Sequence, residues 1–356
     1  MIFLIWRTYR YILLFALVLG FSAQTWALQI YRSGNPADLP TQTNLAVCLA
    51  GGGSDDAWAE GWNYLLRQAN GGDVVVIRSD GRRGEYEGWI FNDEGQHGFA
   101  KVNSVTTLVI ESLDDAERAN AVQAINHAEL IFFAGGDQAN YIKWLVGSSV
   151  SRAVMKAITT RHVPIGGTSA GMALLAGIDF SGKFASPKDH SSNVTSDDVL
   201  QDPTGYFVDL DRNLIVAPFL NNVVTDTHFS QRGREGRLVG FMARAIYNRY
   251  NDIQFNSIKG IAADEDTAAC YGMSGVVKVF GQGNVFFLKG QRDPERLQNH
   301  HSLDWNGDGE AVSTYVVSAS HAEARFNLKT WSGIGGTQEF WAVHGVNEEI
   351  PILIRR

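Results

Sequence analysis

The stretch VPIGGTSAGMALLA, residues 163–176, decides the fold of this chain. It begins with a short apolar run typical of a buried strand, and its last residues, 172–176, favour a helix. Between the two lies Gly167-Thr168-Ser169-Ala170-Gly171, a G-x-S-x-G pattern whose tight turn projects the serine hydroxyl above a sheet. The flanking residues must be small because the backbone folds back closely there. We therefore predict a strand–turn–helix element with Ser169 as a catalytic nucleophile.

Outward from this element, short β-rich apolar runs alternate with longer amphipathic stretches between residues 44 and 177. This alternation predicts an α/β fold with a mostly parallel sheet flanked by helices. The near-continuous apolar runs suit strands that are buried on both faces. The expected strands are 45–49, 74–78, 106–111, 130–134 and 163–166, and the expected helices are 55–68, 114–127 and 151–160.

The C-terminal part has a different pattern, with strands and turns from residue 258 onward. We expect an α/β domain that carries the Ser169 element over residues 28–275 and a β-rich C-terminal extension over 276–356, packed on the same domain. A segment rich in Ser, Asp, Asn and Gly, residues 179–211, predicts a long loop.

Residues 1–27 are interpreted as a signal peptide, because Arg7 and Arg10 precede an apolar run and small residues follow it. The run is shorter than the roughly 20 residues that cross a bilayer as a helix. We therefore expect a secreted or periplasmic protein with no stable membrane span after the leader is removed. A net charge of −8 argues against nonspecific nucleic-acid binding. The two cysteines, Cys48 and Cys270, exclude a disulfide-rich scaffold and leave one bridge open.

Ligands of open α/β sheets bind beyond the carboxyl ends of the strands, and three glycine-bearing loops fall there. They are Gly51-Gly52-Gly53, Gly135-Gly136-Asp137 and Gly166 to Ser169. All three are expected to face one site.

Serine is a weak nucleophile and needs a base. Among nine histidines, His228 has the most unusual setting, between the strand-like Val224-Thr225-Asp226 and the helix expected over residues 232–250. Six of the other histidines, His97, His127, His162, His190, His300 and His301, lie in polar loops or beside helix ends. We therefore predict His228 as the base.

The third member should be a carboxylate that fixes the imidazole tautomer. Glu265 ends a short apolar segment and is one candidate. Spacing alone does not choose between it and Asp264, Asp226, Asp189 or Asp197.

A cluster of arginines, Arg232, Arg234 and Arg237, follows His228 in an otherwise acidic protein. Guanidinium groups grip carboxylates in a bidentate manner, so the cluster predicts an acidic group in the substrate. The alternative is a helix surface paired with Glu235. Gln138 lies after a strand at the same edge of the sheet and is a further candidate substrate ligand.

Together these residues resemble the cyanophycinase and aspartyl dipeptidase family of serine peptidases, peptidase family S51. The resemblance covers most of residues 45–275. Its carriers, in the family's order, are Ala50 to Gly53, Phe133 to Gln138, Gly167 to Gly171, Asp226 to Phe229, Arg232 to Leu238 and Gly260 to Ala268.

The resemblance implies a class I glutamine amidotransferase-like fold and acyl transfer to water without metal or organic cofactor. Ser169 would attack, His228 would move the proton and Glu265 would be the preferred acid. Gly136 and Ala170 would donate to the oxyanion. The remaining family positions, Gln138, Arg232, Arg234 and Arg237, would hold aspartyl carboxylates.

The substrate that the resemblance implies is cyanophycin, a polyaspartate with arginine on its β-carboxyls, cleaved to β-Asp-Arg dipeptides. The chain departs from the family pattern at Thr227, where many cyanophycinases have Gln. An aspartyl or isoaspartyl dipeptidase and a noncatalytic binding protein are the alternatives, and the family favours a homodimer.

Overall fold

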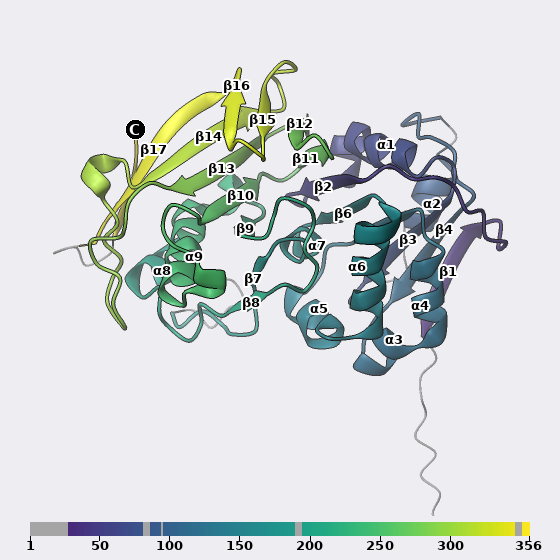
Figure 1. The fold of residues 1–356 in the computed structure, drawn as a ribbon, viewed down its shortest axis with the longest axis horizontal. Coiled ribbons are helices and arrows are strands. Elements are labelled where there is room, and N and C mark those ends of the chain that lie inside the picture. The colour runs from purple at the N-terminus through teal and green to yellow at the C-terminus, as the bar shows by residue number, and fades with distance from the viewer. Residues whose placement is uncertain (1–27, 81–85, 94, 189–193, 346–350) are drawn as a thin grey trace, which may run out of the picture.

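The computed structural model describes residues 28–80, 86–93, 95–188, 194–345 and 351–356. The predicted signal peptide, the candidate acid Asp189 and His190 lie outside these residues. The described chain forms two sheets that lie side by side, one covered by helices and the other richer in C-terminal strands (Figure 1).

The first sheet has ten strands in the order β1-β4-β3-β5-β6-β2-β11-β12-β15-β16. The neighbours within β4-β3-β5-β6-β2 are parallel, whereas the pairs outside this group are antiparallel. The prediction of a mostly parallel sheet is therefore not confirmed, because the sheet is mixed and only its central group of strands is parallel. The bounds are β1 Gln29–Gly34, β2 Ala46–Ala50, β3 Asp73–Arg78, β4 Ser104–Val109, β5 Leu130–Phe133, β6 Ile165–Thr168, β11 Thr267–Gly272, β12 Val276–Gly281, β15 Arg325–Asn327 and β16 Ser332–Ile334.

Helices cover both faces of the parallel group because successive side chains of a strand point to opposite faces. On β3, Val74 and Val76 pack in the same cluster as Trp62 of α1, whereas Val75 and Ile77 share a cluster with the helices of the other face. The helices are η1 Asp55–Trp58, α1 Ala59–Gln68 and α2 Tyr86–Phe91, then α3 Leu113–Glu117, α4 Ala119–Asn126, α5 Gln138–Leu145, α6 Ser149–Arg161 and α7 Ala170–Ala173.

The single helix expected over residues 114–127 is two helices. Arg118 separates α3 from α4 because its backbone is extended, with φ −66° and ψ 135°. In the described residues, every helix is too short or too polar to cross a bilayer.

The second sheet has eight strands in the order β18-β17-β14-β13-β10-β9-β7-β8, and it is also mixed. Helices α8 and α9 pack on one face through residues such as Val199, Leu238 and Phe241. The bounds are β7 Ile178–Phe180, α8 Ser196–Gln201, β8 Leu210–Arg212, β9 Val223–Asp226, η2 Ser230–Arg232, α9 Glu235–Tyr247, η3 Tyr250–Asp252, β10 Lys259–Ala263, β13 Asn284–Gly290, η4 Gly307–Gly309, β14 Val312–Ser318, β17 Thr337–His344 and β18 Ile352–Arg355.

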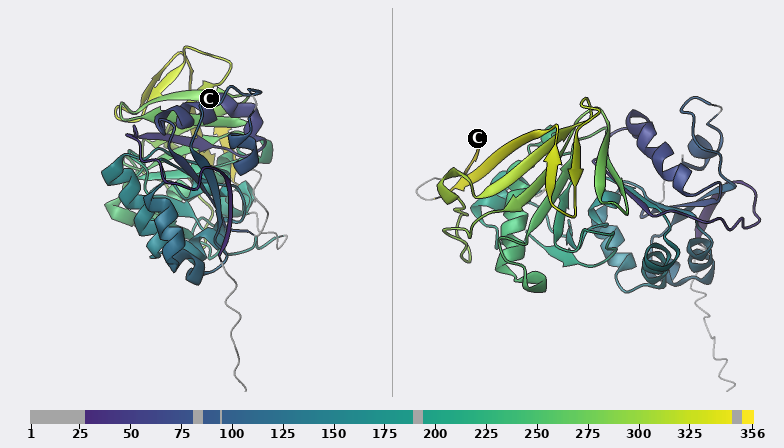
Figure 2. Two further views of the ribbon diagram at one scale, coloured as in Figure 1. Left: turned by 90° about the vertical axis from the view of Figure 1, so that its right-hand side faces the viewer. Right: turned by 45° about the horizontal axis from the view of Figure 1, so that its top comes forward.

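The segment predicted as a C-terminal extension adds strands to both sheets (Figure 2). Strands β12, β15 and β16 lengthen the first sheet, and β13, β14, β17 and β18 lengthen the second. The two groups meet where the rings of Phe287 and Phe326 stack with their centroids 3.9 Å apart. The division at residue 275 stays a prediction.

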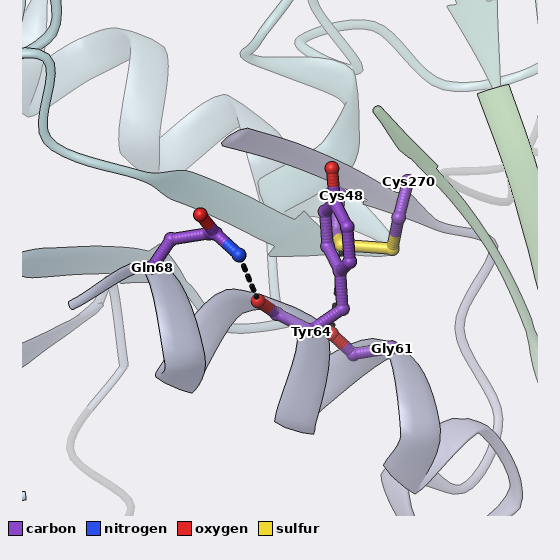
Figure 3. The surroundings of a disulfide bond; sticks show 5 residues. All are labelled: Cys48, Gly61, Tyr64, Gln68 and Cys270. Carbon is purple, nitrogen blue, oxygen red and sulfur yellow. Dashed lines mark hydrogen bonds between the residues drawn. A yellow bond between two sulfur atoms is a disulfide. The ribbon is translucent and has the colours of Figure 1, made fainter. Parts of the chain in front are cut away.

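A disulfide bond joins Cys48 of β2 to Cys270 of β11 (Figure 3). The two cysteines are directly opposite each other in the antiparallel pair, with their Cα atoms 4.1 Å apart. The bond links residues 222 positions apart in the chain. It ties the parallel group of strands to the antiparallel strands that follow.

Candidate active site

The turn between β6 and α7 holds Ser169 in a backbone conformation that residues other than glycine rarely adopt, with φ 52° and ψ −118°. Such a conformation costs about 1–3 kcal/mol and persists where the surroundings enforce it. Here, a Cβ at Gly167 would lie 2.3 Å from the carbonyl oxygen of Gly171. A Cβ at Gly171 would lie 2.0 Å from that of Phe133. The strand–turn–helix context expected for the G-x-S-x-G pattern is therefore present, and both glycines are required by close backbone contact.

The hydroxyl of Ser169 lies within hydrogen-bond distance of the predicted base. Its Oγ is 2.7 Å from Nε2 of His228, and Nδ1 of His228 is 2.6 Å from Oε1 of Glu265. With Nδ1–H donating to Glu265, Nε2 is free to accept the serine proton. The structure thus brings the three predicted residues together in the order of a catalytic triad.

His228 follows β9 and leaves the strand through a positive φ of 49°. Its backbone N–H donates to the carbonyl of Gly51 over 2.8 Å. A Cβ at Gly52 would lie 2.3 Å from Cε1 of the imidazole. The predicted glycine loop therefore positions the imidazole by close contact.

The surroundings favour the neutral form of His228. Burial lowers the pKa of its imidazole, the hydrogen bond with Glu265 opposes this, and the charges of Arg232 and Arg234 lower it further. A neutral imidazole is the form that can act as a general base.

Glu265 follows β10, and its backbone N–H donates to Oε1 of Gln231 over 2.9 Å. A guanidinium nitrogen of Arg232 lies 3.7 Å from the Glu265 oxygen that contacts His228. The other described candidates for the acid lie elsewhere. Asp264 accepts from the backbone N–H groups of Ser230 and Asn284, Asp226 pairs with Arg237, and Asp197 is exposed on α8.

The predicted oxyanion donors lie on two loops beside Ser169. Ala170 is the first residue of α7, where a helix N–H has no partner within the helix. A Cβ at Gly135, next to Gly136, would lie 3.5 Å from Cβ of Ser169. The role of Gly136 and Ala170 stays a prediction.

Two of the predicted substrate ligands, Arg234 and Arg237, contact other groups of the protein. Arg237 donates to Asp226 through Nε over 2.9 Å and also through a terminal nitrogen. Arg234 donates to the carbonyl of Thr227 over 2.9 Å and lies 3.6 Å from Asp226. Both arginines are buried, and burial lowers the pKa of Arg234 to about 10. Asp226 therefore already supplies the carboxylate that these residues were expected to find in a substrate.

Gln138 donates its side-chain amide to the carbonyl of Phe180. Arg232 is half-exposed, with its closest charged contact at Glu265. The interpretation of the arginines as a helix surface paired with Glu235 is wrong for Arg234 and Arg237, because both are buried against Asp226.

A cavity of about 460 Å³ opens beside Ser169 and His228. None of the four predicted substrate ligands lines it. Its lining residues are Gly52, Gly53, Ser54, Asp55, Asp56, Arg78, Tyr86, Trp89, Gly135, Thr168, Ser169 and His228.

Six of these residues belong to none of the predicted loops or site residues: Ser54, Asp55, Asp56, Arg78, Tyr86 and Trp89. Arg78 ends an expected strand at the carboxyl edge of the sheet, which is a signal that could have identified it. Asp55 accepts from the hydroxyl of Tyr86 over 2.6 Å and from the indole of Trp58 over 3.0 Å. Burial raises the pKa of Asp55 to about 6, although these hydrogen bonds oppose the change.

One group of carboxylates in the described residues has the spacing of metal ligands, Asp38, Asp73 and Glu129. It lies at the start of β3, whereas Arg78 and the cavity lie at the end of that strand. The oxygens of Asp73 accept from Ser104 and from the backbone N–H of Leu39. The group therefore has protein partners and is remote from the chemistry proposed at Ser169.

No protein-family model matches the chain. A cyanophycinase of Synechococcus elongatus is 27% identical to it over 276 residues, which cover 76% of this chain and 74% of the relative. A cyanophycinase of Geminocystis herdmanii is 25% identical over 301 residues, covering 83% and 97%. A solved structure of a peptidase from an acI-B1 Actinobacterium aligns with 73% of this chain and 97% of its own, at 16% identity and a TM-score of 0.47.

Because the alignments cover 76% and 83% of this chain, both include the positions of Ser169, His228 and Glu265. By sequence, this chain is therefore a cyanophycinase-like peptidase.

Proposed function

We propose that this protein is an exported serine-type exopeptidase that hydrolyses cyanophycin to β-Asp-Arg dipeptides through an acyl-enzyme. The observation that carries the proposal is the continuous contact from Ser169 Oγ through the imidazole of His228 to Glu265. The substrate is suggested by the names of the relatives, which are cyanophycinases.

In the first half of the reaction, Oγ of Ser169 attacks the scissile carbonyl carbon while Nε2 of His228 takes the hydroxyl proton. Glu265 stabilises the imidazolium that forms. As the C–N bond breaks, His228 gives the proton to the leaving amine, and the acyl group stays on Ser169 as an ester.

In the second half, a water molecule attacks the ester carbonyl, and His228 takes a proton from that water. The C–O bond to Ser169 then breaks, the serine oxygen recovers a proton from His228, and the carboxylic acid product leaves. The only reactants are the peptide bond and water, so no cofactor is needed.

The developing oxyanion would be stabilised by the backbone N–H groups of Gly136 and Ala170. A donor of this kind contributes about 3 kcal/mol to transition-state stabilisation in a serine hydrolase. The position of Ala170 at the start of α7 and of the Gly135–Gly136 loop beside Ser169 supports this assignment. A class I glutamine amidotransferase-like fold remains part of the proposal.

Export to a secreted or periplasmic location is supported by the disulfide between Cys48 and Cys270. Structural disulfides persist in oxidising compartments and are rare where glutathione and thioredoxin keep thiols reduced. The apolar run within residues 1–27 supports the same location.

The proposal is tested by incubating purified mature protein with cyanophycin and, separately, with Asp-X and isoaspartyl-X dipeptides. Release of β-Asp-Arg from the polymer is expected, and the Ser169→Ala variant should release none. Cleavage of the dipeptides alone would replace the proposed substrate with that of an aspartyl or isoaspartyl dipeptidase.

Labelling by a fluorophosphonate gives a test that does not depend on the substrate. The wild-type protein is expected to be labelled at Ser169, and the Ser169→Ala protein should not be labelled. A folded wild-type protein that neither reacts with the probe nor cleaves any of these substrates would be a noncatalytic binding protein.

A further inference from the structure

Arg78 is a cationic side chain in the cavity beside Ser169. Among the described residues, no carboxylate accepts a hydrogen bond from its guanidinium. It ends β3 and is largely buried, with 11% of its side chain exposed. The described residues give it one charged contact, from Nε to Asp80 over 3.4 Å, and this Nε makes no hydrogen bond.

The other charged groups that line this cavity are already engaged. Asp55 accepts from Tyr86 and Trp58, and Oδ1 of Asp56 lies 3.3 Å from Nε2 of His97. His228 is held between Ser169 and Glu265. Asp56, like Arg78, has an ion-pair contact without a hydrogen bond, and of these two groups only Arg78 can bind a carboxylate.

A second residue that lines the same cavity also has a buried donor without a hydrogen-bond partner among the described residues. The indole N–H of Trp89 is buried and has no hydrogen-bond partner among the described residues. A buried donor without a partner costs about 1–3 kcal/mol. Arg78 and Trp89 both line the cavity, so a ligand bound there can supply an acceptor to these side chains once they turn toward it.

The arginines predicted for this task are in a different position. Arg234 and Arg237 share Asp226, so both already have a carboxylate partner inside the protein. A carboxylate brought to them would compete with Asp226, which already accepts hydrogen bonds from Arg237. Arg78 lies 3.4 Å from Asp80 without a hydrogen bond, so a carboxylate brought to it would meet guanidinium donors that Asp80 does not use.

We propose that Arg78 binds a carboxylate of the substrate next to the scissile bond and so determines the specificity of this site for acidic peptides. The inference rests on the proposed function and deepens it. The substrate class is a peptide that places a free carboxylate, from a side chain or a chain end, within the cavity while its carbonyl carbon is at Ser169.

The test compares two synthetic substrates, an oligomer of β-Asp-Arg units and the same oligomer with its free carboxylates converted to carboxamides. Both are assayed with wild-type protein, Arg78→Met and Arg78→Lys. Arg292→Met is the matched control, because Arg292 is an exposed arginine paired with Asp308, a residue that also does not line this cavity.

For the carboxylate substrate, Arg78→Met is expected to lower kcat/KM about 10- to 100-fold, through KM rather than kcat, since a hydrogen bond to a charged group is lost. Its rate with the carboxamide should stay near that of wild type. Arg78→Lys should recover part of the preference, because lysine keeps the charge and loses the bidentate geometry.

The inference is overturned if wild-type protein cleaves both substrates equally well, or if Arg78→Met keeps the preference for the carboxylate. If Arg78→Met fails to fold, the Arg78→Lys protein provides the test. A preference for the carboxylate substrate that is unchanged in Arg78→Lys then overturns the inference. Failure of the proposed function looks different, because the wild-type protein then neither cleaves the oligomer nor reacts with a fluorophosphonate.

Discussion

Two polar clusters begin within three residues of one another at the end of β9. One is buried in the protein, and the other lies beside a cavity. Asp226 turns inward and pairs with Arg237, with 3% and 5% of their side chains exposed. His228 leaves the strand through a positive φ and meets Ser169 at the wall of an open cavity. Both clusters consist of residue types that suit catalysis or binding. Burial and pairing therefore decide which of these residues remain available to a substrate.

The largest effect is expected at the open cluster. Ser169→Ala and His228→Ala should each lower kcat by about 10,000-fold or more, because members of a triad act as a unit. Stability should change little in Ser169→Ala, since serine and alanine bear the same cost of a positive φ. Turnover is measured by release of β-Asp-Arg and folding by circular dichroism, and near-normal turnover in either variant would remove the triad assignment.

The next largest effect is expected at the buried cluster. Asp226→Asn leaves the guanidinium groups of Arg234 and Arg237 buried without their carboxylate, which should lower the free energy of unfolding by about 3–5 kcal/mol. Urea unfolding measures this change. Asp308→Asn is the control, since it breaks an exposed pair with Arg292 and should change stability by less than about 0.5 kcal/mol.

Asp226→Asn also tests whether the buried cluster serves only the fold or contributes to substrate binding. A stable Asp226→Asn protein with a raised KM for acidic substrates would show that the buried arginines serve the substrate and not the fold.

A smaller effect of opposite sign is expected at Asp179 on β7. This carboxylate is fully buried, and neither oxygen has a hydrogen-bond partner among the described residues. Burial, together with the charge of Asp211, raises its pKa well above the ordinary value. Because the unfolded chain releases this proton at lower pH than the folded protein, the carboxylate makes the protein less stable as the pH rises.

Asp179→Asn should therefore raise the free energy of unfolding at pH 7.5 by about 1–3 kcal/mol and change it less at pH 4.5. Urea unfolding at the two pH values measures both. A loss of stability at pH 7.5 would mean that Asp179, like Asp226, has a favourable partner in the folded state.

The smallest effect is expected at Arg232, on the rim of the open cluster. Its charge lowers the pKa of His228, so Arg232→Gln should raise that pKa and move the acid limb of the kcat/KM profile to higher pH. Arg292→Gln, far from this cluster in the sequence, should leave the profile unchanged. An acid limb that moves to lower pH would show that Arg232 acts through Glu265 rather than on the imidazole.

Much of the fold could be predicted because it depends on local patterns. The parallel strands β2 to β6 have apolar residues on both faces, and Gly167 and Gly171 permit one particular turn. What could not be predicted were pairings between distant residues. The antiparallel strands at both edges, the bond from Cys48 to Cys270 and the break at Arg118 depend on such contacts or on small differences in backbone energy.

The sequence by itself determined the chemical groups of the site, because a serine in a tight glycine turn and a histidine at a strand end have recognisable local settings. Only the tertiary structure decided which acid joins them and which arginines remain available. Asp226 and Glu265 are both carboxylates near strand ends, but one meets a buried guanidinium and the other meets the imidazole of His228. That choice depends on which strands lie side by side, β9 beside β10, and no local pattern encodes it.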